Sequence, residues 1–174
     1  NDYLKGTDIS LFAFGFSQRI GDAGVIGLNV VSMNFGEIEV TTPDEPEGGR
    51  GTFKPNLMNI SVSYAKAFSN SIYGGITVKI ISESIADANA QGIAIDAGIQ
   101  YVTGEREQIK FGIALKNIGP TMKFSGDGLL YNAYLPEQEN SFSMGMPSES
   151  FELPTALDIG AAYDFWIGDF NRIT

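Results

Sequence analysis

The sequence contains neither cysteine nor histidine. The absence of cysteine excludes disulfides, thiol nucleophiles and thiolate metal sites, and the absence of histidine removes the commonest general base and transition-metal ligand. Basic residues are also scarce: 11 lysines and arginines stand against 21 acidic residues, which gives a net charge of −10. Proteins that bind nucleic acid need clustered basic side chains for the phosphates. We therefore expect no enzymatic activity, no cofactor, no metal site and no nucleic-acid partner.

Long apolar runs are missing too. No stretch of about 18 or more consecutive apolar residues occurs, so the sequence predicts no transmembrane helix. Residues 1–5 do not form the basic segment that leads into the apolar stretch of a signal peptide. Yet 43% of the 174 residues are apolar, and 21 are glycine. The apolar side chains must therefore follow a different pattern.

That pattern has a period of two. In residues 93–101, isoleucine, alanine and tyrosine alternate with alanine, aspartate, glycine and glutamine. Successive side chains of a β-strand leave the backbone on opposite sides, so this alternation predicts a strand with one apolar face. The expected strands are 9–20, 25–40, 57–68, 72–82, 93–101, 109–118 and 155–165, with a bulge near 31–33 and the start of an eighth strand at Phe170.

The connections between these segments alternate in length. Those after the first, third, fifth and seventh strands are short, whereas 41–56, 83–91 and 118–154 are medium or long. In an up-and-down meander, alternate connections lie at the same end of the sheet. Outer-membrane barrels have this asymmetry, with short periplasmic turns and longer extracellular loops. The strand lengths also suit the roughly 9–11 residues that a tilted strand needs to cross the hydrocarbon layer.

Small residues dominate the face opposite the bulky one. The solvated face of a soluble sandwich would carry many lysine, glutamate, threonine and arginine side chains, whereas alanine, glycine and serine prevail here. Space is tight inside a narrow barrel, so this face indicates a lumen. A soluble antiparallel sandwich stays the alternative. The candidate lumen charges, expected to pair across the lumen, are Lys79, Asp96, Lys110, Lys116, Asp158 and Asp164.

Aromatic residues gather near the tight turns, as an interfacial girdle requires. They are Phe68, Tyr73, Tyr101, Phe165 and Trp166. Lys66 falls on the bulky face, and near a turn its ammonium group can snorkel to lipid headgroups. These features predict an all-β, antiparallel, up-and-down transmembrane β-barrel. Residues 1–174 are expected to be one barrel domain, incomplete at both ends.

Several segments match a known family in their order and spacing. They are 35–38 with Thr41, 59–65, 77–81, 94–101 with Gly104, 111–119 and 153–163. Together they resemble the PorV/PorQ family of outer-membrane proteins. The resemblance implies a FadL-like barrel of about fourteen strands, of which this chain is an internal portion, in the outer membrane of Bacteroidetes or related bacteria.

The resemblance also implies a function. The best-known family member serves the type IX secretion system, where it partners the translocon barrel, receives cargo with a C-terminal signal domain and passes it to a surface attachment complex. We therefore expect outer-membrane lipid, secretion-system proteins and secreted cargo as partners. The alternative is a FadL-like transporter of hydrophobic small molecules. No segment matches the family's N-terminal hatch or its last strands.

The second long loop, 118–154, is rich in apolar residues. An extracellular loop of this kind either folds over its own barrel mouth or presents its side chains to a partner, and both alternatives stay open. The candidate partner-contacting residues are Leu129, Leu130, Tyr131, Tyr134, Phe142, Met144, Met146 and Phe151.

Overall fold

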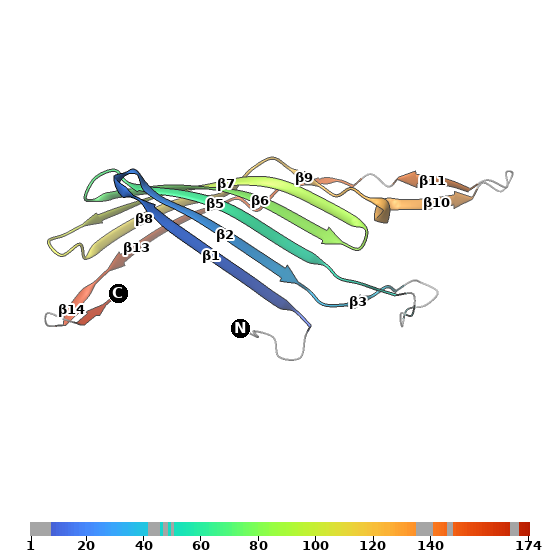
Figure 1. Cartoon of the computed structure of the whole chain (residues 1–174), viewed down its shortest axis with the longest axis horizontal. Coiled ribbons are helices and arrows are strands. Elements are labelled where there is room, and N and C mark those ends of the chain that lie inside the picture. The colour runs from blue at the N-terminus through green and yellow to red at the C-terminus, as the bar shows by residue number, and fades with distance from the viewer. Residues whose placement is uncertain are drawn as a thin grey trace.

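A computed structural model describes residues 8–41, 46, 49, 51–134, 141–145, 148–167 and 171–174. Within these ranges there is no α-helix, and a seven-stranded antiparallel sheet dominates the chain (Figure 1). Its strands are β1 (Ser10–Ile20), β2 (Gly24–Asn34), β5 (Asn56–Ala67), β6 (Ile72–Ile85), β7 (Ala88–Thr103), β8 (Ile109–Ile118) and β13 (Ala156–Tyr163). No helix of this part of the chain is long and apolar enough to cross a membrane.

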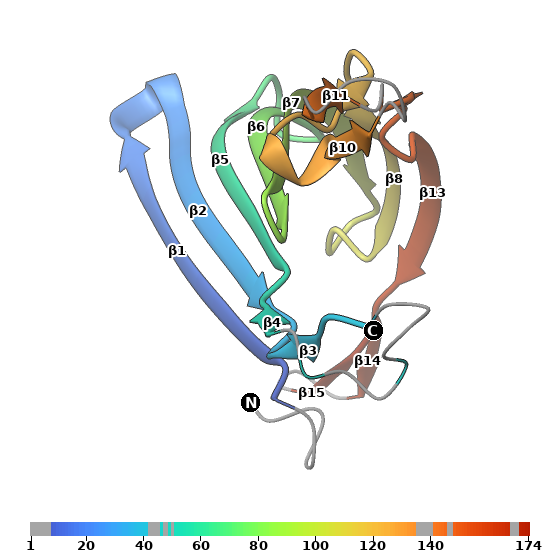
Figure 2. The ribbon, with the colours of Figure 1, turned by 90° about the vertical axis from the view of Figure 1, so that its right-hand side faces the viewer.

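The sheet is an up-and-down meander. Each strand pairs antiparallel with the next, in the order β1-β2-β5-β6-β7-β8-β13. Seen end-on, the sheet curves around a concave side (Figure 2). Strands β1 and β13 are its edges and do not pair with each other within the described ranges. The predicted all-β antiparallel meander is therefore confirmed, but these strands form an open sheet, and a total of about fourteen stays a prediction.

The connections at one end of the sheet are short, as predicted. The 3₁₀ turn η1 (Gly21–Ala23) joins β1 to β2, residues 68–71 join β5 to β6, and residues 104–108 join β7 to β8. At the other end, the predicted connection 83–91 is wrong, because β6 continues to Ile85 and β7 begins at Ala88. Ala86, with φ of 50°, closes this tight turn. The apolar alternation stops at Ile80, but the backbone of β6 stays paired with β7 through the polar residues 82–84 as far as Ile85.

The bulge predicted near 31–33 is wrong as well. β2 pairs without a register shift with both β1 and β5, and it ends at Asn34. The apolar pattern shifts because the two faces exchange polarity at the loop end of the sheet. Here the bulky face becomes polar at Ser32 and Asn34, whereas Val31 and Met33 are half-buried on the other face.

The two expected long loops contain short strands. In the first, β3 (Ile38–Glu39) pairs with β4 (Thr52–Phe53). In the second, β9 (Met122–Lys123) pairs with β12 (Ser150–Phe151), and η2 (Asp127–Leu129) precedes the hairpin of β10 (Leu130–Tyr134) and β11 (Ser141–Gly145).

The last predicted strand divides at Asp164. Beyond β13, strand β14 (Phe165–Ile167) pairs with β15 (Asn171–Ile173) as a small separate hairpin. Phe170, the expected start of the eighth strand, lies outside the described residues.

The two faces of the sheet differ sharply. Most bulky apolar residues of the convex face are more than a third exposed. One such register row is Phe16, Leu28, Val62, Val78 and Ile95. The concave face carries small and charged residues. The small core lies on the concave face at the loop end, around Ile81, Ala90, Ala94 and Met122.

Candidate functional site

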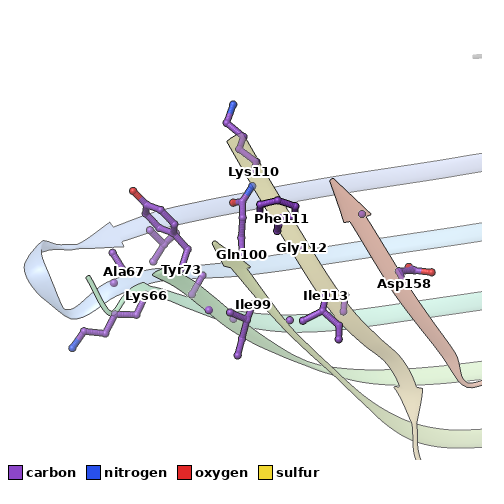
Figure 3. A pocket seen from close by; sticks show the side chains of 18 of the residues that line it. Lys66, Ala67, Tyr73, Ile99, Gln100, Lys110, Phe111, Gly112, Ile113 and Asp158 are labelled. Atoms are coloured by element: carbon purple, nitrogen blue, oxygen red, sulfur yellow. The ribbon is translucent and has the colours of Figure 1, made fainter. Parts of the chain in front are cut away.

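A hollow of about 1040 Å³ follows the concave face near the turn end. It reaches from Arg19 on β1 to Ala162 on β13, so nearly the whole width of the sheet contributes. Its bottom is bare because glycines face one another across strands: Gly75 lies opposite Gly98, and Gly112 lies opposite Gly160. Lys110 and Gln100 rise on this side of the sheet, whereas Lys66 and Ile99 point to the other side (Figure 3).

All six candidate lumen charges lie on the concave face and form three ion pairs. Their Nζ to Oδ2 distances are 2.6 Å for Lys79–Asp96, 2.7 Å for Lys110–Asp164 and 2.6 Å for Lys116–Asp158. The expectation that they pair across a lumen is wrong for the described chain. Each pair joins neighbouring strands, or the residue just after one, at diagonal register positions. Diagonal neighbours lie about 7–8 Å apart, a span that a lysine side chain covers easily.

The Lys79–Asp96 pair belongs to a larger polar network built by a β-bulge. The register between β7 and β8 shifts between Ile95 and Ala97, and Asn117 adopts a left-handed φ of 57° at the bulge. Its backbone N–H donates to Asp96 Oδ1 at 2.8 Å, and its Oδ1 accepts from Lys79 Nζ at 2.8 Å. The bulge thus turns a backbone donor towards a carboxylate.

The same residue holds both ends of the segment 118–154. The Asn117 side-chain amide donates to the Pro154 carbonyl at 3.0 Å, and the Asn117 carbonyl accepts from Thr155 Oγ1 at 3.1 Å. Asparagine tolerates the left-handed conformation better than most residues. The residue therefore combines a backbone role with four polar contacts.

Asp164 is the most buried charge of the described chain, with 2% of its side chain exposed. Besides Lys110, it accepts from Thr174 Oγ1 at 2.8 Å and lies 3.7 Å from Arg172 Nη1. Its backbone N–H donates to the Gln108 carbonyl at 2.8 Å. These contacts fasten the junction between β13 and β14 to the turn before β8.

Residues 122–124 and 151–153, from the two ends of the second long segment, cover the concave face at the loop end and are called the strap here. Met122 is 1% exposed and lies over Gly92, where a Cβ atom would stand 2.5 Å from Met122 Cγ. Phe124, Phe151 and Leu153 pack against the same core, and the rings of Phe124 and Phe151 stack with centroids 5.4 Å apart. Residues 122–124 and 151–153 of this segment therefore fold onto the sheet of the same chain.

Two of the eight predicted partner-contacting residues are half-buried in the structure, and the side chains of the other six are not described. Phe151 is half-buried in the strap and faces inward, and Leu129 is half-buried at the end of η2. The backbones of β10 and β11 carry five more of the eight, which are Leu130, Tyr131, Tyr134, Phe142 and Met144. Their side chains, and all of Met146, lie outside the described residues.

The predicted aromatic girdle is divided between the faces. Phe68 and Tyr101 belong to the convex face, at 70% and 43% exposure. Tyr73 rises instead on the concave side together with Gln100 (Figure 3), because it is out of phase with the convex position Ile72. Phe165 and Trp166 are exposed near the same end of the sheet, where Arg106 lies 5.7 Å above the Trp166 ring.

Sequence reasoning missed Asn117 and Met122. A β-bulge of this kind leaves only a weak trace in the sequence: the bulky alternation of β8 stops at Leu115 and resumes at Ile118. Met122 stands two residues after Pro120, in a stretch that reads as loop, and its burial depends on the distant glycine at position 92.

Within the described ranges, no group of three or more acidic residues is placed to hold a metal ion. The candidate site on the concave face therefore consists of three ion pairs and a hollow of about 1040 Å³. In comparisons with known proteins, no family model and no curated protein matches the chain.

Proposed function

We propose that this protein is an outer-membrane β-barrel protein of the PorV/PorQ type, whose convex face contacts lipid and whose concave face lines the barrel interior. The supporting observation is the convex face itself. Many of its bulky side chains, from all seven strands, are 37–75% exposed. A soluble monomer rarely exposes an apolar patch larger than a few hundred Å², and a lipid bilayer is the solvent that suits such a face.

The slant of this apolar surface supports the proposal independently. The row through Phe14 on β1 meets β7 at Ile93, whereas the row through Ile159 on β13 meets β7 at Ile99. On β13 the apolar stretch is centred just beyond Ile159. The centre of the apolar surface thus shifts by about seven residues, or roughly 23 Å, over six strand spacings of roughly 29 Å.

That displacement corresponds to an angle of about 40° between the strands and the normal of the apolar band, from the same spacings. Strands of outer-membrane barrels tilt by about 35–45°. A flat membrane requires the band to slant in this way across tilted strands. A soluble sandwich has no such requirement.

Within the membrane proposal, we assign the protein a non-enzymatic role in type IX-like protein secretion. The sequence resemblance supports this role, and the strap leaves the β10–β11 hairpin extending from the sheet as a place for partner contact (Figure 1). Pull-down of the intact protein from its native cells tests the role. Secreted proteins that share a C-terminal domain should be recovered with it.

The matched variants for this test exchange aromatic residues at opposite ends of the sheet. Tyr131→Ser with Tyr134→Ser should reduce recovery of cargo at least fivefold, whereas Tyr101→Ser with Tyr163→Ser should leave it unchanged. Recovery of no secreted protein by the wild type, in a preparation that is inserted in membrane, would contradict the secretion role.

A FadL-like transporter of hydrophobic small molecules is the second candidate. It is favoured by the hollow of about 1040 Å³ on the concave face, which is mostly lined by apolar and glycine surface. Two results together would support the transporter over the secretion role. Cells should take up fatty acids only when the protein is present, and the pull-down should recover no secreted cargo.

A further inference from the structure

The convex face carries a groove of about 560 Å³ near the turn end. Its walls are apolar side chains from five strands. They are Tyr64, Ile76, Ile99, Ile113, Leu115 and Leu157. Bulky side chains cover most of the convex face, and the groove is a place where the surface is indented between them.

Two small residues lie on the floor of the groove. Gly74 on β6 lies between Lys66 and Ile99 in the register, and Ala97 on β7 lies between Ile76 and Leu115. Both positions belong to the convex face, where the neighbouring rows carry isoleucine, valine or leucine. The Phe68 ring covers Gly74, whereas a larger side chain in place of Ala97 would project into the groove.

A cation stands at one end of this groove. Lys66 is exposed, lies directly opposite Gly74, and points to the convex side (Figure 3). It takes part in none of the ion pairs found among the described residues. The Phe68 ring lies beside it, over Gly74, where an added Cβ would stand 2.7 Å from the ring. A lysine beside an aromatic ring at the margin of an apolar face suits the headgroup level of a bilayer.

The groove also has a suitable direction. It crosses the strands from Tyr64 on β5 to Leu157 on β13, and Lys66 is the next convex position beyond Tyr64 on β5. Because the apolar band slants across the strands, the β5 end lies at the turn-side margin of the band and the β7 part lies at its middle. The groove therefore runs obliquely from the headgroup level into the hydrocarbon layer.

We propose that this groove binds one membrane phospholipid, with an acyl chain along Ala97, beside the Phe68 ring, and the anionic headgroup phosphate at Lys66. The inference rests on the proposed membrane location and adds a defined lipid site to it. An apolar channel with a single cation at its outer end is complementary to a molecule that is apolar along its length and anionic at its tip.

Native mass spectrometry of the full-length protein in detergent, titrated with phosphatidylglycerol, tests this site. The wild type should retain one lipid at low lipid-to-protein ratio. Lys66→Ala should weaken binding of that lipid at least fivefold by removing the phosphate partner, and Ala97→Leu should weaken it similarly by filling the groove. Lys54→Ala, which removes an exposed lysine outside the sheet, and Ala161→Leu, which enlarges a convex residue outside the groove, are the matched controls.

Protease protection in phospholipid vesicles is measured first for the wild type and all four variants. Failure of the wild type to insert would overturn the membrane location, and the lipid site with it. If all five proteins insert, equal lipid retention by the wild type and either groove variant overturns the lipid site alone. Retention of no lipid by the inserted wild type does the same.

Discussion

On the convex face of the sheet, isoleucine, valine and phenylalanine lie beside one another from strand to strand, whereas on the concave face the same strands bring together glycine, alanine and three ion pairs. The backbone is shared, so the difference arises entirely from which residues occupy odd and even positions. Most bulky convex side chains of the described residues are more than a third exposed, whereas the concave charges at positions 79, 96, 110, 116, 158 and 164 are paired within the sheet. The two faces are therefore built for different surroundings, and substitutions should have different consequences on each.

The largest effect is expected from a charge on the convex face. Ile95→Lys places an ammonium group in the middle of the apolar band, and should lower the free energy of unfolding in phospholipid vesicles by about 2–4 kcal/mol. Ala114→Lys puts the same group on the concave face directly opposite Asp158. It should cost less than about 1 kcal/mol, because Asp158, although paired with Lys116, is about half exposed and lies within reach of the second ammonium group. Urea titration in vesicles measures both, and equal costs would refute the assignment of the faces.

The next effect compares two methionines. Met122→Ala removes a fully buried side chain from the strap and should cost about 2–3 kcal/mol, because a cavity remains. Met58→Ala, on the convex face at 38% exposure, should cost less than about 1 kcal/mol, because a side chain that is already partly exposed leaves no enclosed cavity. The same urea titration measures the difference. Limited proteolysis of Met122→Ala should also cut the strap faster, and an unchanged rate would speak against the packing of Met122.

A smaller effect is expected within the concave face. Asp96→Ala removes the carboxylate partner of Lys79 and leaves the Asn117 backbone N–H without its acceptor, and should cost about 1.5–2 kcal/mol. Asp158→Ala breaks a pair whose side chains are about half exposed, and should cost less than about 0.5 kcal/mol. Unfolding at low and high salt distinguishes them: salt should reduce the small effect and leave most of the large one. The reverse order would contradict the bulge network.

The smallest effect concerns an ion pair outside both faces. Lys54 Nζ lies 2.8 Å from Glu37 Oε1, and the hydrogen bond and charge of Glu37 raise the pKa of Lys54 above its ordinary value. A raised lysine pKa stabilises the fold at every pH below the unfolded value, and the contribution disappears as the pH rises through the folded pKa. Glu37→Gln should return the Lys54 pKa towards its ordinary value in an NMR titration. An unchanged titration would show that the pair does not persist in solution.

The sequence predicts much of the sheet because each strand carries its own period-two signal. Five of the seven strands were expected to within three residues at each end, whereas β2 ends six residues earlier and β7 begins five residues earlier than expected. The shared face of the six charges follows from the alternation along each strand. The hairpin at Ala86 was missed because the apolar pattern ends before the strand does. The bulge expected near Val31 does not occur. Apolar residues move there from the convex to the concave face of β2, and in the sequence this change looks the same as a shift in register.

The site could be predicted only where it depends on alternation along one strand. The partners of each lysine depend on the stagger between strands, which the sequence of a single strand does not contain. The burial of Met122 over Gly92 and the position of Lys66 beside Gly74 depend on pairings between segments that are distant in the sequence. Long-range register, rather than residue type, is the missing information.

The Asn117 contacts have a consequence for how this protein can vary. Asn117 binds the chain at the point where it leaves the sheet and at the point where it returns. Both ends of the segment between these points are therefore held at a fixed position on the sheet. The entropy of closing a loop grows only slowly with its length. Insertions, deletions or wholesale exchange of residues beyond the strap can therefore alter what the molecule presents at this end without disturbing the strands that carry it.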